Sequence, residues 1–435
     1  MKKFYCIVAA MLLAACTKEE TSIAKIEEVK NPYAVTPDEA VQLLKTVIGG
    51  ETTRAVSIGD IKTLRKSDFV PTTRGGEDGD LIYIVDLENG GSAVMGADKR
   101  MEPIYAILDE TKVSPEQLTF TATRSDDGEQ DIEEYVMGLV NNKIQVDVMG
   151  FEHTLPEMPM IPRPHEVTKT TMLGSKNPML RTKWHQRSPY NDRYPKGNYE
   201  NQYFVDGVMV AGCGPIAISQ VLYFHQLPTS LYNGNYYPNF NLLSECEYQG
   251  TFSDAACAEV ANYMIKIAGE LCDYLYHTYN PRPTINDADL VNNLTALGLD
   301  VDSVATYNIG GVITLLDDNL PVIISGAHYG SHPLLDLGHM WVIDGYKSHR
   351  ESIYLREYFG GGPMDYTDTF ISSTDYNLVH CNYGWGGSCD GYYSSGVFDL
   401  TSQLDSDMIV DQIGDIPAVQ PYIFNNQLMY VVYEK

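Results

Sequence analysis

A single cysteine between two glycines is the first residue of this sequence with clear chemical potential. Residues 209–226 read MVAGCGPIAISQVLYFHQ, and Cys213 stands where an apolar run with helical spacing begins. At a helix N-terminus, the free backbone N–H groups and the helix dipole favour a thiolate. A small buried side chain at a turn is the simpler interpretation. The chemical interpretation requires a base, a group that orients the base, and donors for an oxyanion.

The sequence offers one candidate for each of these partners. His339, in DLGHMWVIDGY, follows Gly338 and begins a strand-like alternation, and its imidazole is suited to accept the thiol proton. Asn382, in HCNYGWGG, carries an oxygen that can accept from the second ring nitrogen of this imidazole. Gln186 can donate an amide N–H to the oxyanion, together with the backbone N–H of Cys213. Each residue alone is explained equally well by packing or turn chemistry, but the order Gln, Cys, His, Asn matches a known mechanism.

Four stretches resemble the streptopain family of papain-like bacterial cysteine peptidases. They are TKWHQRSPYN, AGCGPIAISQVLYFHQLP, GHMWVIDGY and HCNYGWGGSCDGYY. The resemblance implies a cysteine endopeptidase with Cys213 as nucleophile, His339 as base, Gln186 as oxyanion donor and Asn382 as the residue that orients His339. It also implies an α+β fold, in which a helical half and an antiparallel sheet half form a papain-like domain after a small α+β prodomain.

Other segments extend the resemblance and also limit it. The segment YIVDLENGGSAVMGADKRMEPIYAI resembles the inhibitory prodomain of the family, and Trp385 resembles the tryptophan of the glycine-rich loop beside the substrate cleft. Tyr383 stands where the family has tryptophan, which we expect to tune the activity. Gly214 and Pro215 replace Val-Ala after the cysteine, and Cys-Gly-Pro also occurs in bacteriocin-leader peptidases. The alternatives are therefore a related leader peptidase or amidase, and a non-catalytic surface binding protein with the same fold.

Local patterns predict the elements that position these residues. Thr36 and Glu39 form a capping box at the start of TPDEAVQLLKTVIGG, which predicts a helix. Asn89-Gly90 predicts a hairpin within LIYIVDLENGGSAVMGAD. Residues 131–149 and the run AACAEVANYMIKIAGELCDYL have helical periodicity. After about residue 320, strand-like runs alternate with glycine turns, so helices precede a sheet in the second domain. This order is typical of an α+β protein with a cleft between its halves.

The sequence divides into four predicted segments. Residues 1–15 are predicted to be a lipoprotein signal peptide, 16–152 a lipidated tether and inhibitory prodomain, 153–170 a proline-rich linker, and 171–435 the papain-like catalytic domain. Prodomain removal by autoproteolysis is implied by the resemblance, with Lys169, Lys176 and Arg181 in the expected interval. Residues 348–377 are longer than the usual family connection, and their glycine triplet at 360–362 favours a flap over the cleft. A surface insertion is the alternative.

The N-terminus predicts export and lipidation. Two lysines precede an apolar run from Phe4 to Ala15, which is shorter than the roughly twenty residues that cross a bilayer. The run ends in LAAC, which resembles a bacterial lipobox with Cys16 as the acylated residue. We therefore expect an outer-membrane or cell-surface lipoprotein whose catalytic domain is released by processing. An ordinary signal peptide is the alternative.

Composition narrows the expected partners. The 435 residues carry 30 Lys and Arg against 58 Asp and Glu, a formal net charge of −28. Such a charge repels nucleic acids and anionic lipid headgroups, so membrane contact is expected only through the Cys16 lipid. Protein or peptide substrates and the chain's own prodomain are the expected partners, and the mechanism needs no metal or organic cofactor. Five cysteines remain if Cys213 is catalytic and Cys6 and Cys16 are set aside, and their pairing stays open.

Overall fold

The computed structural model describes most of the chain. The described residues are 33–49, 57–69, 79–88, 90–119, 132–153, 166–199, 203–231, 234–248, 250–272, 275–277, 281, 283, 285, 289–326, 339–359, 366–398 and 429–434. The helices are α2 (Pro37–Gly49), α3 (Lys66–Phe69), α4 (Pro115–Thr119), α5 (Ile132–His153), α6 (Cys213–Phe224), α7 (Phe240–Ser244), α8 (Asp254–Leu271), α9 (Leu290–Ala296), α10 (Ile309–Asp317) and the 3-10 helix η2 (Ser395–Val397). In these parts of the chain, no helix combines the length and the apolar character needed to cross a membrane.

One large antiparallel sheet runs through the molecule. Its strands, in chain order, are β1 (Ile58–Arg65), β2 (Asp80–Leu87), β3 (Ser92–Gly96), β4 (Ile104–Leu108), β5 (Glu166–Lys176), β8 (Asp300–Thr306), β9 (Val322–Gly326), β10 (His339–Tyr358), β11 (Tyr366–Asn382), β12 (Gly391–Ser394) and β13 (Met429–Glu434). The spatial order is β1-β2-β3-β4-β12-β11-β10-β9-β13-β8, and β5 pairs with β10. A separate two-stranded sheet joins β6 (Phe204–Val205) to β7 (Val208–Met209). The α+β class is therefore confirmed.

Two elements near the start of the described chain follow their local sequence signals. The backbone N–H of Glu39 donates to the Thr36 hydroxyl, and the Thr36 N–H donates to the Glu39 carboxylate at 2.8 Å, which is the predicted capping box of α2. Strands β2 and β3 form the predicted hairpin, with Gly90 at a positive φ of 110°. Residue 89 lies outside the described residues.

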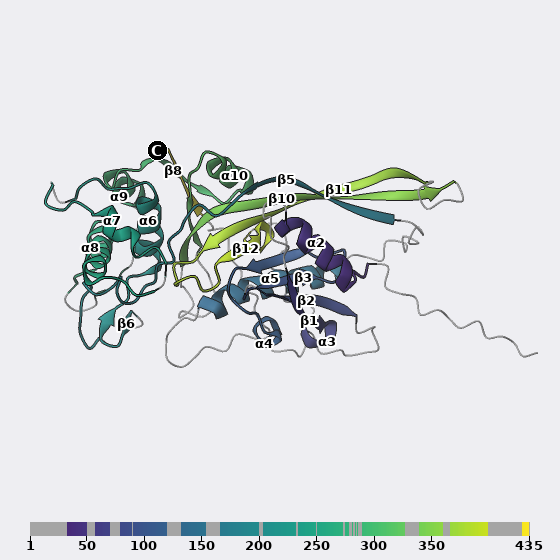
Figure 1. Ribbon diagram of the computed structural model, residues 1–435, viewed down its shortest axis with the longest axis horizontal. Coiled ribbons are helices and arrows are strands. Elements are labelled where there is room, and N and C mark those ends of the chain that lie inside the picture. Colours follow the sequence, from purple (N-terminus) through teal and green to yellow (C-terminus); the bar gives the residue numbers. More distant parts are fainter. Residues whose placement is uncertain are drawn as a thin grey trace, which may run out of the picture.

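The N-terminal part (residues 33–153) joins the C-terminal part (residues 166–434) through the sheet itself. Strand β4 pairs antiparallel with β12, with Tyr392 opposite Ile107. Helix α2 covers one face of this joint, and its Leu44 and Val47 belong to the same core cluster as Leu378 and Tyr392 of the C-terminal part. Figure 1 shows α2 and α5 close to strands β1 to β3 and the long strands passing over them. The two parts therefore share hydrophobic core as well as backbone hydrogen bonds.

The C-terminal part has the expected helical and sheet halves. Helices α6, α7, α8 and α9 gather at one end of the molecule, away from the long strands β10 and β11 (Figure 1). The apolar stripe of α6, including Ile218, Val221 and Leu222, is completely buried. Helix α6 packs against β10, and α8 packs against α6. The helix that begins at Cys213 is thus held between the sheet and the other helices.

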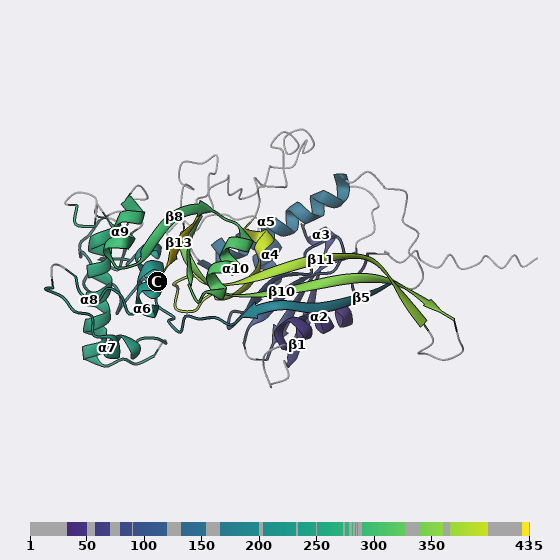
Figure 2. The same cartoon turned by 90° about the horizontal axis from the view of Figure 1, so that it is seen from above.

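Two predictions about the connections are wrong. Residues 348–358 and 366–377 are not a flap, because they continue β10 and β11 as paired strands that point away from α6 (Figures 1 and 2). Bidentate ion pairs between Arg350 and Asp375 and between Arg356 and Asp368 join opposite positions of this hairpin. The linker predicted for 153–170 ends earlier than expected, since β5 begins at Glu166 and pairs with β10 over its whole length. Residues 154–165 and the glycines at 360–362 lie outside the described residues.

Candidate active site

Cys213 is the first residue of α6, and the glycine before it makes this start possible. Gly212 has a φ of 89°, and a Cβ there would lie 2.9 Å from the carbonyl oxygen of Pro283. The Cys213 side chain is partly exposed. Burial raises the pKa of its thiol, while the backbone N–H groups of Met340, Gly214 and Cys213 itself lower it. The sulfur therefore has the N–H donors expected at a helix start but is a thiol in this state.

His339 is the first residue of β10, next to the residue whose N–H reaches the Cys213 thiol. Its ring packs against the rings of Trp341 and Tyr383, with both centroid distances 6.0 Å, and those two rings also meet each other at 5.8 Å. Burial lowers the pKa of His339 to about 4, and a hydrogen bond from the ring to the Tyr383 backbone opposes the shift only in part. The structure thus places the Cys213 thiol next to Met340, the residue after His339, with Cys213 as a neutral thiol and His339 as a neutral imidazole.

The Asn382 side chain does not make the contact predicted for it. Its oxygen accepts from Gln220 Nε2 and from the Gly384 backbone N–H, both at 3.1 Å, and its Nδ2 donates to the Thr182 carbonyl at 2.7 Å. The expected bond to His339 is not among these contacts, because all the partners of Asn382 come from α6, the glycine-rich loop and the segment before Gln186. In this state the Tyr383 backbone, and not Asn382, orients the imidazole.

Asn382 instead joins the three segments that carry the predicted site. Gln220 lies seven residues after Cys213 and therefore on the same face of α6. Gly384 has a φ of 72°, and a Cβ there would lie 2.6 Å from Ile216 of that helix, so the loop approaches α6 as only glycine allows. The helical spacing of Cys213 and Gln220 is the sequence signal that would have pointed to this junction.

Gln186 lies beside the segment that leads to Cys213. It is buried, and its backbone carbonyl accepts the N–H of Ala211 at 2.8 Å, two residues before the nucleophile. The Trp385 ring meets His185 edge-on at 5.7 Å, so the glycine-rich loop packs against the same segment. The predicted oxyanion donor and the predicted cleft residue therefore lie on adjoining segments. Gly338 and Cys16 lie outside the described residues.

Two further observations complete the site. The position after the cysteine is glycine because a Cβ on Gly214 would lie 2.3 Å from Ile285 Cδ1, which fills the space that a larger residue would take. Within the described residues, no three His, Cys, Asp or Glu side chains are grouped so that they could hold a metal ion. The described groups are suited to acyl transfer by a thiol, a base and N–H donors.

The candidate site lies in a part of the chain that matches a known protein family. Residues 184–393 match the model of the Peptidase C10 family, a span that contains every predicted catalytic residue. Among solved structures, the chain is similar to a Prevotella intermedia prointerpain A fragment, at 17% identity over 86% of this chain and 100% of that chain, with a TM-score of 0.46. It is also similar to active wild-type Prevotella intermedia interpain A cysteine protease, at 22% identity over 60% of this chain and 97% of that chain, with a TM-score of 0.38. No curated protein matches the sequence.

Proposed function

We propose, from the premise that residues 184–393 belong to the Peptidase C10 family, that this chain is the precursor of a cysteine endopeptidase. One observation carries the proposal: the thiol at the start of α6 meets the first residues of β10, where His339 lies. When a peptide carbonyl is attacked at this point, two sources of N–H donors adjoin each other: the Cys213 backbone and the segment of Gln186, whose carbonyl accepts the N–H of Ala211. This arrangement supports a peptidase more directly than a surface binding protein, which needs none of it.

The proposed reaction has two halves. The Cys213 proton passes to His339, and the thiolate attacks the peptide carbonyl to form a tetrahedral oxyanion, which the Cys213 N–H and the Gln186 amide stabilise. His339 then protonates the leaving amine as the C–N bond breaks and a thioester remains. In the second half, His339 takes a proton from water, the hydroxide attacks the thioester, and the thiol is released.

The N-terminal part is proposed to be the inhibitory prodomain. It pairs with β12 and shares core residues with the C-terminal part, so it binds as a folded unit. The site beside it is electrostatically latent, since burial raises the pKa of the Cys213 thiol and lowers the pKa of His339 to about 4. A thiolate–imidazolium pair requires the opposite order of these two pKa values. Activation therefore has to change the surroundings of both groups.

The paired strand β5 limits where the precursor is cut. Lys169 and Lys176 lie opposite Ser352 and Tyr346 of β10, and Lys169 also forms an ion pair with Asp368 at 2.7 Å. A peptidase binds its substrate as an unpaired extended segment, so a cut at either lysine requires β5 to leave the sheet first. We place the processing bond before Glu166, so that β5 stays with the mature enzyme.

Self-processing tests the proposed function. Purified precursor incubated alone is expected to lose the residues before Glu166, and the product is expected to hydrolyse casein. The Cys213→Ala precursor should stay intact under the same conditions, with mass spectrometry as the measurement. An intact wild-type precursor that also fails after removal of its N-terminal part by an added protease would favour the binding protein. Processing without casein hydrolysis would favour a leader peptidase or amidase.

We also propose that Cys16 is acylated and anchors the precursor. The support is the lipobox-like LAAC sequence alone. Because Cys16 lies on the N-terminal side of the proposed cut, processing is expected to release the catalytic domain from the membrane. Fractionation of cells that carry the wild type or Cys213→Ala measures this, with the variant in the membrane fraction and the wild-type catalytic domain in the soluble fraction. Equal membrane binding of both would contradict the release.

A further inference from the structure

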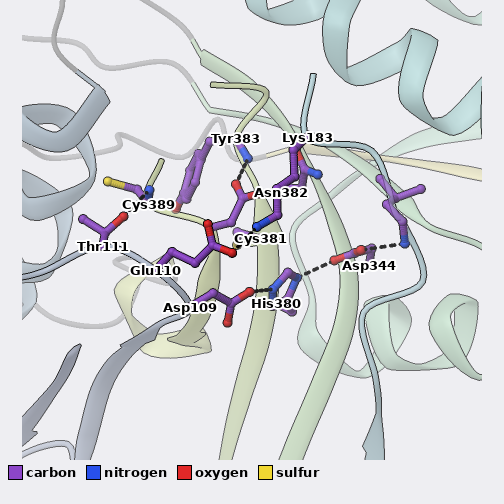
Figure 3. Close-up of polar contacts among 12 residues, drawn as sticks. Asp109, Glu110, Thr111, Lys183, Asp344, His380, Cys381, Asn382, Tyr383 and Cys389 are labelled. Carbon is purple, nitrogen blue, oxygen red and sulfur yellow. Dashed lines mark hydrogen bonds and ion pairs between the residues drawn. The ribbon is translucent and has the colours of Figure 1, made fainter. Parts of the chain in front are cut away.

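Three consecutive residues after β4 form a polar contact with the C-terminal part that the proposed reaction does not use. The Asp109 N–H donates to the Asp390 carbonyl at 3.0 Å, and the Thr111 hydroxyl accepts the Cys389 N–H at 2.9 Å. Between them, the Glu110 carboxylate lies 2.7 Å from the Lys183 amine. Figure 3 shows this acidic turn reaching toward β11 beside Asn382 and Tyr383. The turn extends the β4–β12 pairing toward the candidate active site.

From this turn, the Asp109 side chain reaches a buried histidine of the C-terminal part. His380, on β11, has Nε2 at 3.2 Å from Asp109 Oδ2 and Nδ1 at 2.6 Å from Asp344 Oδ1 (Figure 3). An ionised carboxylate only accepts hydrogen bonds, and only the imidazolium form of histidine has N–H donors at both ring nitrogens. With both carboxylates ionised, the geometry therefore requires His380 to be protonated while the N-terminal part is docked.

The groups around His380 come from each element packed against it. Asp109 follows β4, Asp344 lies on β10, and Asp390 precedes β12. The Tyr392 ring of β12 meets the imidazole edge-on at 5.0 Å, and the Lys347 amine lies over that tyrosine ring, 5.1 Å from its centroid. Three carboxyl groups thus surround one imidazolium, and one of the three is supplied by the N-terminal part.

We propose that the N-terminal part docks with uptake of protons at the Asp109–His380–Asp344 contact, so that rising pH loosens it from the C-terminal part. This deepens the proposed function, on which it rests, by assigning a regulator to the same precursor. Asp344 also accepts the Leu180 N–H at 2.9 Å and lies on the strand that begins with His339, while His380 lies two residues before Asn382. The contact therefore reaches both strands that build the candidate site.

The direction of the pH effect follows from the charges. Burial lowers the pKa of His380, but the carboxylates of Asp344 and Asp109 outweigh it and raise this pKa to about 10. Burial raises the pKa of Asp390 to about 7; His380 opposes the shift and Asp109 adds to it. The Asp109 carboxylate raises both pKa values, so its removal alone lowers both. Docking is thus strongest at low pH. It weakens as the pH rises through about 7, the pKa of Asp390, and on toward about 10, the pKa of His380.

Hydrogen exchange of the full-length Cys213→Ala precursor tests this proposal without any need for catalysis. Protection of the amides at 104–109 and 390–393, corrected for intrinsic exchange, is expected to fall between pH 6 and 9.5, by up to about tenfold per pH unit for each proton released. Adding Asp109→Asn should flatten this slope. Adding Glu110→Gln removes the ion pair with Lys183 but leaves His380 as it is, so the slope should remain.

Two results would overturn the proposal. One is protection that does not change with pH in the Cys213→Ala precursor, and the other is an unchanged slope after Asp109→Asn. Amides of β9 and of 340–343 on β10 report global folding and should stay protected in every variant. If the hydrogen-exchange test fails while self-processing is observed, only the proposed proton-linked contact is rejected. If the expected pH slope is found but the precursor does not process itself, only the proposed peptidase activity is rejected.

Discussion

Replacing His339 with alanine is expected to lower kcat/KM of the processed enzyme by about 10²- to 10⁴-fold, the usual contribution of a positioned acid–base group. The variant also loses the partner that would hold the Cys213 proton. Because His339→Ala cannot process itself, its N-terminal part is removed by added wild-type enzyme. Hydrolysis of a fluorogenic peptide by the purified product is the measurement.

A second histidine on the same strand supplies the matched control. His349 is also buried on β10, and burial lowers its pKa to about 4, but its ring stacks on Tyr376 at 5.4 Å and lies ten residues from His339. His349→Ala should therefore reduce thermal stability while kcat/KM stays within a few-fold of the wild type. Equal losses of kcat/KM in both variants would show that the role of His339 is only structural.

Gly391→Ala is expected to release the N-terminal part from the precursor. A Cβ at this position would lie 2.3 Å from the Ile107 carbonyl oxygen and 2.8 Å from Leu108 Cα, both backbone atoms of β4. Backbone cannot move aside without breaking the β4–β12 pairing, and overpacking of this kind costs about 1–3 kcal/mol, or roughly five- to 150-fold in docking. The rate of self-processing should rise accordingly, and in the Cys213→Ala background an added protease should cut the N-terminal part faster.

Gly396→Ala separates this clash from a general effect of alanine. Gly396 also faces the N-terminal part, but a Cβ there would meet Glu102 Oε1 at 2.8 Å and Lys143 Cε at 3.1 Å, which are the ends of flexible side chains. Its rates of processing and of proteolysis should stay near those of the wild type. If Gly391→Ala also leaves both rates unchanged, the β4–β12 pairing does not hold the precursor closed.

Local signals in the sequence are sufficient to predict several elements of the fold. The capping box of α2, the hairpin at Gly90 and the buried stripe of α6 depend on residues within a few positions of one another, and all three are present. The resemblance to a cysteine peptidase family, carried by four short stretches, agrees with the family region at 184–393. The positions of Cys213 and His339 follow, because each begins the element that its own stretch predicts.

The pairing of strands that lie far apart in the sequence could not be predicted from local patterns. The contact between β4 and β12 joins residues more than 280 positions apart. The first residues of β5 were assigned to the proline-rich linker at 153–170, because nothing local marks β10 as their partner. The insertion at 348–377 has glycines and aromatics like a loop, but cross-strand ion pairs make it a hairpin. Asn382 was assigned to His339 by motif order, whereas its amide bonds to three segments that lie far apart in the sequence, and only the fold brings these together.

The central claim is that Cys213 is the nucleophile and that His339 activates it. The direct measurement is peptide mapping of the processed enzyme after reaction with a thiol-directed epoxide, since the described residues include six free cysteines: Cys213, Cys246, Cys257, Cys272, Cys381 and Cys389. The prediction is one adduct, on Cys213, that forms at neutral pH and is lost in His339→Ala. A processed enzyme that cleaves peptides while Cys213 stays unlabelled, or that labels equally well without His339, would contradict it.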